Sequence, residues 1–281
     1  MTWSFEDDRG ERVEVAERPR RVLAYGQAAQ TLVRLGVPVV GYFGSQHQAD
    51  SGAAAVAGLE VPSVGAGDAV DQELVASLQP DLMVGVTYAG EVYGVSADVA
   101  GKLTEVAPIV LIRIAGEPEL KDVIGRFHEL AVALGGTAED GEAVLTAALE
   151  KLSGAADGVR VMALSGGTPT DAYVANPPYW PSLRLLADAG VPFVPTSATG
   201  GWEVVHWTDL GSSHPADILL YDQRPNSLGA EQLAEIPQWA ELPAVAAGHV
   251  LAWNPEPPLT FEAAAAAADA LTAEITKKKA D

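Results

Sequence analysis

The sequence predicts an α/β protein in which two doubly wound lobes are joined by a single long helix. In both halves of the chain, short apolar stretches alternate with stretches of helical periodicity, which is the pattern of a parallel sheet covered by helices. Between the halves, apolar residues recur at helical spacing behind a capping threonine. The expected domains are therefore an N-terminal lobe at residues 1–136, a linker helix at 137–157 and a C-terminal lobe at 158–281.

The composition fits a globular protein and excludes several classes of function. A chain of 281 residues can bury one large core or two ordinary ones. The net charge of −21, from 17 basic and 38 acidic residues, argues against a nucleic-acid partner, because no basic stripe is present to neutralise phosphates. The lack of cysteine excludes disulfides, thiolate metal sites and thiol nucleophiles. No apolar run approaches the roughly 18 residues that a membrane-spanning helix needs.

The first half is expected to open with a hairpin from Trp3 to Val15, because the segment 7–10 has the composition of a turn between alternating apolar residues. A short apolar strand at 22–25 then leads into a helix at 28–35 that Gly36 closes. The elements expected after it are strand 39–43, helix 72–78, strand 82–86, helix 97–106, strand 109–114 and helix 120–134.

The linker helix is expected to be capped by Thr137, with Asp140 as its third residue and Leu145, Ala148 and Leu152 on one face. Its length of about 24 Å is enough to brace two lobes; the alternative is an ordinary surface helix of a single domain. The pattern then resumes with strands 159–164 and 172–175, helix 181–189, strands 193–195 and 218–221, helix 231–240, strand 250–253 and a terminal helix from 260 to about 276. Both halves therefore read as Rossmann-like lobes.

Several landmarks, in their order and spacing, resemble one family of transport proteins. They are the segments 5–10 and 18–22, Glu73 seven residues before 80–82, and the segments 173–175, 215–219 and 243–248 with Trp239 ahead of the last. The chain resembles the substrate-binding proteins of ABC importers of the helix-linked class, which carry ferric siderophores, haem and cobalamin. The resemblance implies a ligand cleft between the lobes, lined by strand ends, as is general for open α/β sheets. It implies no intrinsic cofactor, because iron arrives inside the ferric siderophore.

Within that family, the local similarity is to binders of hydroxamate siderophores of the ferrichrome type. Tyr93 resembles their pocket tyrosine, and Trp202, after Gly200 and Gly201, resembles their pocket tryptophan. Aromatic walls bury the apolar chain of a siderophore, and a phenol adds one directed hydrogen bond. Further wall candidates lie at expected strand ends or in loops, with ordinary packing as the alternative for each: Tyr25, Tyr42, Tyr88, Tyr179 and Trp180.

One departure from the family bears on the charge of the ligand. Gly67 stands where ferrichrome binders have an arginine, so their usual cationic clamp is absent. Arg184 and Arg224 are the expected substitutes from the second lobe, since an arginine fork suits oxygen-rich anions; a surface salt bridge is the alternative role. A neutral or cationic hydroxamate complex of the ferrioxamine kind fits an acidic protein better than an anionic catecholate.

Two alternatives to siderophore binding remain from the sequence. The same fold could bind cobalamin or haem; His47 and His206 could then meet across the cleft, whereas His128 reads as structural. The histidines lack the short pairings of many zinc sites, so no metal site is expected. An α/β enzyme would need the turn 165–168 as an anion site, but no glycine fingerprint or nucleophile elbow accompanies it. A binding protein without catalysis is therefore expected.

Docking on a permease in the cytoplasmic membrane would use one acidic residue in each lobe. Glu73 fits the first position; Thr208 occupies the equivalent place in the second lobe, with Asp209 beside it and Glu203 nearby. The protein is expected to be a monomer, exported as a lipoprotein or to the periplasm. No secretory signal precedes Trp3, so a cytoplasmic relative is the alternative.

Overall fold

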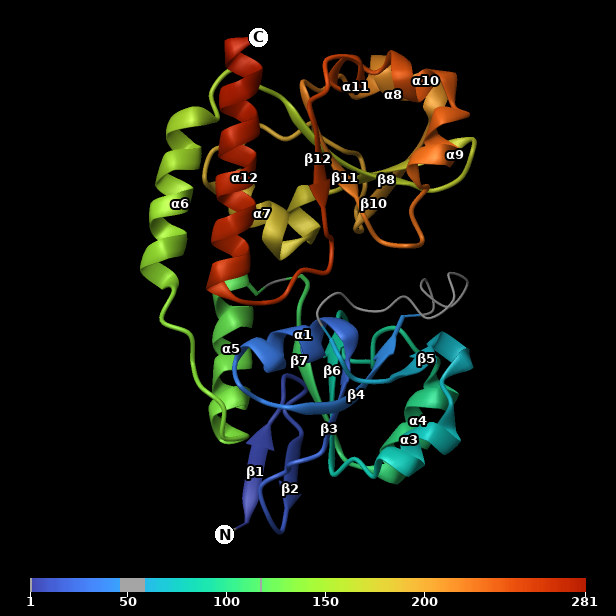
Figure 1. Ribbon diagram of the computed structural model, residues 1–281, viewed down its shortest axis with the longest axis vertical. Helices are drawn as coiled ribbons and strands as arrows, with labels where there is room; N and C mark the ends of the chain where they lie inside the picture. Colours follow the sequence, from blue (N-terminus) through green and yellow to red (C-terminus); the bar gives the residue numbers. More distant parts are fainter. Residues whose placement is uncertain (1, 46–58, 117) are drawn as a thin grey trace. The chain divides into compact units, whose positions relative to one another are not determined.

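A computed structural model describes residues 2–45, 59–116 and 118–281 of the chain. Their contacts form two compact units, which Figure 1 shows in the blue-to-green and the yellow-to-red parts of the chain. Unit 1 comprises Met1–Asp140 and Pro258–Thr260, and unit 2 comprises Gly141–Pro257 and Phe261–Asp281. Each is an α/β lobe.

Unit 1 is built on a five-stranded parallel sheet in the order β5-β4-β3-β6-β7, as far as its described residues go. From β3, at the centre of the sheet, the chain passes through α1 to β4 and β5 on one side of β3. It then crosses to β6 and β7 on the other side of β3. Right-handed crossovers in opposite directions place α1 on one face of the sheet and α3 and α4 on the other. The strands are β3 (Val22–Tyr25), β4 (Val39–Gly44), β5 (Ser63–Ala66), β6 (Leu82–Thr87) and β7 (Ile109–Arg113). The helices are α1 (Gly26–Arg34), η1 (Gly67–Ala69), α3 (Gln72–Leu78), α4 (Ala97–Val106) and α5 (Leu120–Ala133).

The core of unit 1 follows from its apolar strands. Every residue of β3 and of β6 is buried, as expected for parallel strands that are covered on both faces. The expected hairpin is present as β1 (Trp3–Glu6) paired antiparallel with β2 (Arg12–Val15). It contacts α5, where the indole Nε1 of Trp3 donates to the carbonyl of Ala133 at 2.8 Å.

Unit 2 has a mixed sheet in the order β10-β9-β8-β11-β12. β8, β11 and β12 are parallel, whereas β9 runs antiparallel to both β8 and β10. The strands are β8 (Val161–Gly166), β9 (Asp171–Ala175), β10 (Trp202–His206), β11 (Ile218–Asp222) and β12 (Val250–Trp253). The helices are α6 (Glu142–Ala155), η2 (Pro177–Tyr179), α7 (Pro181–Asp188), α8 (Trp207–Ser213), α9 (Ala230–Ala234), α10 (Pro237–Glu241), α11 (Pro243–Ala246) and α12 (Phe261–Ala280).

The helix that the sequence places at 137–157 begins later than expected. Gly141 is the N-cap residue of α6, and Thr137 does not cap it. The backbone N–H of Thr137 instead donates to the carbonyl of Leu35 at 2.8 Å, which ties the segment before the helix to the end of α1. Thus a tertiary partner replaces the local cap that the sequence predicted.

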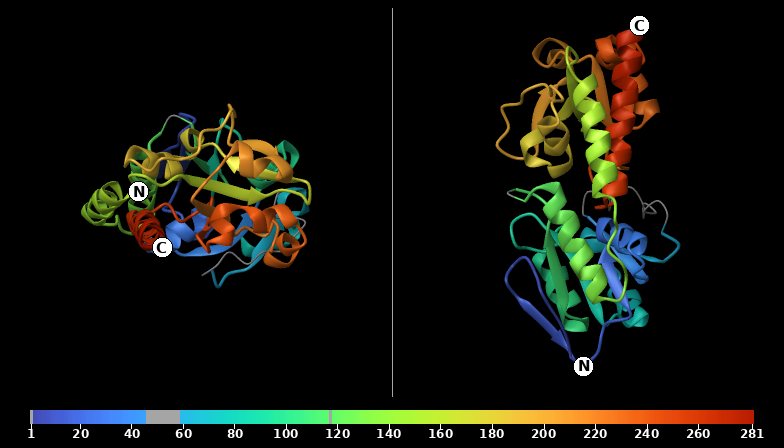
Figure 2. Two further views of the ribbon diagram at one scale, coloured as in Figure 1. Left: turned by 90° about the horizontal axis from the view of Figure 1, so that it is seen from above. Right: turned by 90° about the vertical axis from the view of Figure 1, so that its left-hand side faces the viewer.

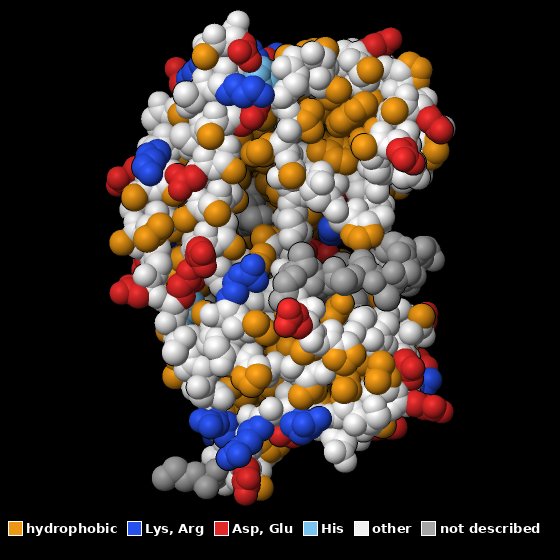
Figure 3. Space-filling view, in the orientation of Figure 1, with side chains coloured by type: hydrophobic (Ala, Val, Ile, Leu, Met, Phe, Trp, Pro, Cys, Tyr) orange, Lys and Arg blue, Asp and Glu red, His pale blue; other side chains and the backbone are white. Residues whose placement is uncertain are grey.

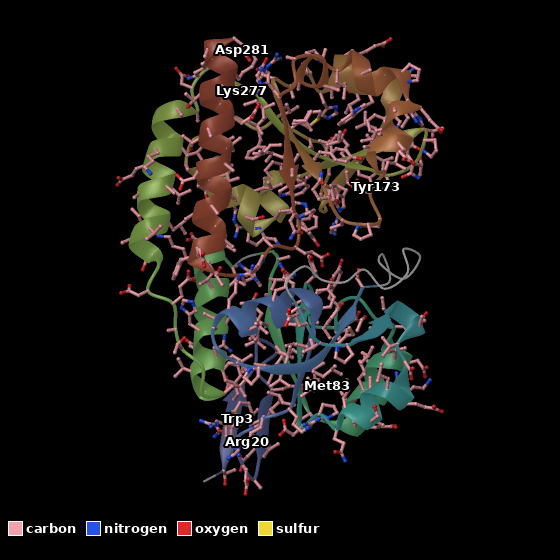
Figure 4. The ribbon with its side chains drawn as sticks, viewed as in Figure 1. Trp3, Arg20, Met83, Tyr173, Lys277 and Asp281 are labelled. Atoms are coloured by element: carbon pink, nitrogen blue, oxygen red, sulfur yellow. The ribbon has the colours of Figure 1, made fainter. Side chains whose placement is uncertain are left out.

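α6 and α12 lie side by side in unit 2, as both views in Figure 2 show. Leu145, Ala148 and Leu152 of α6 are buried, as are Ala268 and Leu271 of α12. At the far end of α12, Lys277 and Asp281, labelled in Figure 4, reach residues that precede β12. Lys277 donates to the carbonyl of Gly248 at 3.2 Å, and a carboxylate oxygen of Asp281 lies 3.4 Å from His249 Nε2.

Two other expected elements differ from the structure. The strand expected at 193–195 is reduced to an isolated bridge between Phe193 and Val161. The helix expected at 231–240 is divided into α9 and α10, because Pro237 has no N–H to continue the first helix and instead opens the second.

The short segment Pro258–Thr260 returns the chain to unit 1 between two elements of unit 2. Its anchor is the backbone N–H of Leu259, which donates to the hydroxyl of Thr31 at 2.9 Å in a buried hydrogen bond. That hydroxyl in turn donates to the carbonyl of Gln27 in α1 at 2.8 Å. Leu259 and Thr260 are both buried, so the segment is part of the core of unit 1.

Exposed arginines gather at the end of unit 1 that carries the N-terminus, where Figure 3 shows a group of basic side chains and Figure 4 labels Arg20 beside Trp3. Their contacts are with the protein itself. Arg21 donates to the carbonyls of Leu78 and Gln79 at the end of α3, and Arg12 lies 3.7 Å from Glu14. None of the helices among the described residues combines the length and the hydropathy that a membrane span requires.

Candidate ligand-binding site

In unit 1, the order of the strands marks one crevice. The chain leaves β3 in one direction and β6 in the other, so the carboxyl ends of these two neighbours flank a topological switch point. Open α/β sheets bind ligands in such a crevice. Tyr25 is the last residue of β3, and Tyr88 directly follows β6. Two of the tyrosines singled out from the sequence therefore lie at this crevice.

These tyrosines belong to a group of four rings, here called the tyrosine cluster: Tyr25, Phe43, Tyr88 and Tyr93. The ring centroids of Tyr25 and Tyr93 are 5.6 Å apart, and the two ring planes are nearly perpendicular. The ring centroids of Tyr88 and Tyr93 are 4.5 Å apart. Phe43 of β4 packs edge-on against Tyr25 at 5.7 Å. Tyr25 is buried, whereas Tyr88 and Tyr93 are half-buried, so the latter two have ring surface left for a ligand.

The loop that carries Tyr93 is held close to the sheet. The N–H of Tyr93 donates to the carbonyl of Val86 in β6 at 3.0 Å. Gly94 has a φ of +91°, and a Cβ atom there would lie 2.9 Å from the Cα of Ser45. Only glycine fits such an approach without displacing backbone. Tyr93 is thus placed by rigid backbone on either side of it.

Two other positions of unit 1 that the sequence singled out, Tyr42 and Gly67, are not part of the tyrosine cluster. Tyr42 precedes Phe43 in β4, so its side chain points to the opposite face of the sheet from the tyrosine cluster, and it is buried. Gly67, at the place of the family's arginine, begins η1 with a φ of +56°. That backbone conformation favours glycine, so an arginine at this position would be strained.

Unit 2 has its own switch point between β8 and β11, whose neighbours β9 and β12 lie on opposite sides. Asp222 ends β11 and is completely buried, and Arg224 follows two residues later. The guanidinium of Arg224 contacts the carboxylate of Asp222 at 2.9 Å and that of Glu256 at 3.4 Å. Its central carbon lies 5.8 Å from the centroid of the Trp202 ring.

Trp202 is one of three indoles that pack together, here called the tryptophan cluster: Trp180, Trp202 and Trp253. The ring centroids of Trp180 and Trp202 are 5.2 Å apart, and those of Trp202 and Trp253 are 6.0 Å apart. Tyr179 packs edge-on against Trp180 at 5.7 Å. Trp180 is buried, whereas Trp202 and Trp253 are half-buried. The cluster therefore also has aromatic surface left for a ligand.

Hydrogen bonds hold the loop before Trp202 in place. The indole Nε1 of Trp180 donates to the carbonyl of Gly201 at 2.8 Å, and the side-chain amide of Asn176 donates to the carbonyl of Gly200 at 2.9 Å. A Cβ atom on Gly201 would lie 3.0 Å from the Trp180 ring. Both glycines that precede Trp202 thus contribute backbone groups to its support.

A cavity of about 180 Å³ lies at the carboxyl end of β11, lined in part by Tyr221, Asp222, Arg224 and Ser227. Burial raises the pKa of the Tyr221 phenol, although hydrogen bonds from its surroundings partly offset the shift. The phenol therefore stays protonated at neutral pH and donates to the carbonyl of Leu228 at 2.6 Å. The other expected cation, Arg184, is half-buried on α7.

Sequence reasoning missed three residues of these groups. Trp253 and Phe43 lie at the carboxyl ends of strands that were expected, so the rule that ligands bind beyond strand ends could have found both. No sequence pattern indicated Glu256, because its contact with Arg224 depends on how the segment after β12 folds.

The described histidines do not converge on a metal. His128, His206, His214 and His249 each lie within 4 Å of a carboxylate, but of a different one in each case. No group of three or more potential ligands that could hold a metal ion occurs in the described part of the chain. His47 lies outside the described residues. Ser165 and Gly166 of the expected anion-binding turn belong to β8, and residues 167–170 form the hairpin connection to β9. The N–H of Gly166 donates to the hydroxyl of Ser227, and Tyr173 packs against Gly167.

A family model described as "Periplasmic binding protein" matches residues 24–257, which is most of the chain and spans both switch points. The chain belongs to this family of periplasmic binding proteins. Its members are binding proteins rather than enzymes, as expected from the sequence. No protein in the curated set matches the chain.

Solved structures of periplasmic binding proteins are similar over nearly the whole chain. The ferric-siderophore receptor DesE from Streptomyces coelicolor is 29% identical, with 97% of each chain covered and a TM-score of 0.85. The siderophore binding protein of the fuscachelin gene cluster of Thermobifida fusca is 20% identical, with 94% of this chain and 98% of that chain covered and a TM-score of 0.66. FhuD from Vibrio cholerae, bound to Fe³⁺-Desferal, is 18% identical, with 92% and 98% covered and a TM-score of 0.64.

The acidic residues expected at a permease occupy comparable positions in this periplasmic binding protein. Glu73 is exposed in the first turn of α3, and Asp209 is exposed in the first turn of α8. Glu203 is engaged, since the N–H of Ser197 donates to its carboxylate at 2.7 Å and His214 lies 3.4 Å away. The hydrogen bond from Ser197 lowers the pKa of Glu203.

Proposed function

We propose that the chain is the substrate-binding component of an ABC importer, which binds a ferric siderophore of the hydroxamate type between its two lobes and delivers it to a membrane permease. One observation carries the proposal: each unit has a half-buried aromatic cluster at or beside its topological switch point, in a chain of the periplasmic binding protein family. The similarity to DesE, a ferric-siderophore receptor, supports iron chelates as the ligand class.

The chemistry of the two clusters suits a hydroxamate chelate. Its backbone of methylene groups needs apolar walls, which Tyr88, Tyr93, Trp202 and Trp253 provide with their half-buried rings. A catecholate complex carries several negative charges and needs several unpaired cations. Arg224 already lies between two carboxylates, so it offers little net positive charge to such a ligand.

The first test is a titration of the intrinsic tryptophan fluorescence with ferrioxamine, ferrichrome, a ferric catecholate, haem and cobalamin in parallel. Saturable quenching by the hydroxamates alone is expected, because the tryptophan cluster would lie against the iron chelate. Saturable quenching by haem or cobalamin alone would overturn the hydroxamate assignment in favour of another ligand of the same fold.

Variants then test the residues. Tyr93→Ala and Trp202→Ala should each weaken ferrioxamine binding by about 2 kcal/mol, or roughly 30-fold, since aromatic anchors dominate such interfaces. Trp239→Phe, in α10 and outside both clusters, is the matched control and should bind with unchanged affinity. Unchanged affinity in both alanine variants, measured by calorimetry, would exclude these rings from the site.

The same proposal includes how the protein docks on the permease and where in the cell envelope it is located. Glu73 and Asp209 would each meet an arginine of the permease, and the protein would be exported and anchored or held in the periplasm. Reversing both charges, as Glu73→Lys with Asp209→Lys, should abolish ligand-dependent stimulation of the importer's ATPase activity while ferrioxamine binding persists. Full stimulation by the double variant would remove these residues from the docking surface.

A further inference from the structure

One arginine of unit 1 is half-buried without a carboxylate beside its guanidinium, as far as the described residues go. Three arginines of this unit are half-buried: Arg9, Arg113 and Arg126. The guanidinium of Arg9 contacts Asp7, and that of Arg126 contacts Asp8, each at 2.7 Å. Within the described part of the chain, no carboxylate oxygen lies within 4 Å of the guanidinium of Arg113. This arginine is therefore the exception to a pattern of ion pairs.

Asp8 contacts Arg113 through the backbone and not through the guanidinium. One carboxylate oxygen of Asp8 accepts from the backbone N–H of Arg113 at 2.8 Å, and the other accepts from Nε of Arg126 at 2.7 Å. Both oxygens of this acid are thus engaged. The positive charge of Arg113 is not cancelled by an ion pair with any described residue.

Arg113 lies at the edge of the sheet that carries the tyrosine cluster. It is the last residue of β7, and the register of the sheet places it beside Thr87, the last residue of β6. Its Nη1 donates to the carbonyl of Tyr88 at 3.3 Å. The guanidinium therefore lies against the backbone of a residue whose half-buried ring belongs to the tyrosine cluster.

The turn that carries Tyr88 is closed by hydrogen bonds that do not involve the side chain of Arg113. The N–H of Gly90 donates to the hydroxyl of Thr87 at 2.6 Å, and the N–H of Ile114 donates to the carbonyl of Thr87 at 3.0 Å. A guanidinium has five N–H donors, and within the described residues the contact with Tyr88 uses one of them. A half-buried cation with donors to spare suits an oxygen-rich ligand.

We propose that Arg113 is a binding residue of the ligand site in unit 1, where its guanidinium donates to the iron-bound oxygens of a hydroxamate chelate that packs on Tyr88. The inference rests on the proposed function, because it concerns the same ligand. Each hydroxamate turns two neighbouring oxygens to the iron, and these oxygens keep lone pairs on the outside of the chelate. The fork of an arginine fits such a pair of oxygens, whereas a lysine supplies one point charge.

The first measurement uses two neutral chelates that share the iron core and differ elsewhere: ferrichrome and the N-acetyl derivative of ferric desferrioxamine B. Arg113→Gln keeps a donor for the carbonyl of Tyr88 but removes the charge and the fork. It should weaken the binding of both chelates by about 10- to 100-fold, as expected when hydrogen bonds from a charged group are lost. Arg113→Lys keeps the charge without the fork, so its affinities should fall between those of the other two proteins.

Arg34→Gln is the matched control. Arg34 is exposed in the last turn of α1 and, like Arg113, donates to one backbone carbonyl, that of Gln30. Its replacement changes the net charge by the same amount and should leave both dissociation constants unchanged. Equal affinities of Arg113→Gln and the unaltered protein would overturn the proposal, while the binding of both chelates would still uphold the proposed function.

A second measurement separates contact with the ligand from support of Tyr88. The gallium forms of the same chelates are diamagnetic, so the Nε–H signals of the arginines can be followed by NMR. The signal that is missing from Arg113→Lys belongs to Arg113, and it should shift when a gallium chelate saturates the unaltered protein. The signal that is missing from Arg34→Gln should not shift.

An Arg113 signal that does not move overturns the proposal even if the affinity of Arg113→Gln falls, because the loss would then act through Tyr88. Arg113→Lys serves for both measurements if Arg113→Gln does not fold. If neither chelate binds the unaltered protein, the proposed function and this inference both fail.

Discussion

Asp7 accepts hydrogen bonds from two parts of unit 1 that are far apart in the sequence. Its carboxylate accepts from the N–H groups of Arg9 and Glu11 at 2.9 and 3.2 Å, and from the N–H of Leu111 in β7 at 3.1 Å. The guanidinium of Arg9 adds a contact of 2.7 Å. The turn composition of 7–10 predicted the hairpin, but nothing in it indicated that this acid is buried against an edge strand. That part of its role depends on which strand lies beside the turn.

We predict that Asp7→Asn lowers the free energy of unfolding by about 2–4 kcal/mol at neutral pH, because amide groups that now donate to a carboxylate lose part of their acceptor. Burial alone would raise the pKa of Asp7, but hydrogen bonds from Arg9 and Leu111 outweigh it, and the pKa is lowered. The stabilisation is complete above the unfolded-state pKa near 3.9 and is lost as the pH falls through the lower pKa of the folded state.

Chemical denaturation at a series of pH values measures this difference. The gap between the two proteins should close in acid, and Glu17→Gln, an exposed acid of the same unit, should show no gap at any pH. A gap that stays constant down to about pH 2 would mean that the carboxylate charge is not its source.

The elements differ in how well the sequence predicts them. The strands of unit 1 are runs of apolar residues closed by glycine or polar residues, and their bounds agree with the expected ones to within a residue or two, except that β5 was not expected. β10 was missed because it lies at the edge of the sheet, with Glu203 and His206 among its five residues. Trp202 was expected to be a pocket residue without being assigned to any element, and it is the first residue of this strand. For the candidate site, aromatic residues could be found one at a time, but their grouping into two clusters required the strand order.

α6 and α12 are expected to depend on each other for stability. Leu152→Ala, at a side chain with 0% exposure, should cost about 2–4 kcal/mol, because it removes apolar contacts and leaves a cavity. Val144→Ala on the same helix, at 60% exposure, should change the stability by less than about 0.5 kcal/mol. Thermal and denaturant unfolding measure both; equal effects of the two variants would contradict the packing of α6 described above.

At the scale of the whole molecule, each unit is made of two separate stretches of the chain. Pro258–Thr260 belongs to unit 1 and separates β12 from α12, both of which belong to unit 2. No feature of the sequence pattern indicated this return, because a single linker at 137–157 was expected. The return depends on a buried hydrogen bond to Thr31, a contact between residues that are 228 positions apart.

Thr31→Val keeps the shape of this side chain but leaves the N–H of Leu259 without its acceptor. The expected cost is about 1–3 kcal/mol, the penalty for a buried donor that loses its partner. Thr146→Val removes a hydroxyl that donates only along its own exposed helix turn, to Glu142, and should have little effect. Hydrogen exchange at Leu259 should accelerate in Thr31→Val alone; unchanged protection there would show that another group holds the segment.

The three-residue return has a mechanical consequence. If the two chain ends are pulled apart, α12 is the first element loaded at the C-terminus, and its 20 residues could extend by about 40 Å. The load then acts between the N-terminus and Thr260, and both of these belong to unit 1. The stretch 141–257 lies between two attachments to the same unit, so it bears no tension until unit 1 breaks or releases the segment. α12 would therefore bear force from the start, whereas the rest of unit 2 would bear it last.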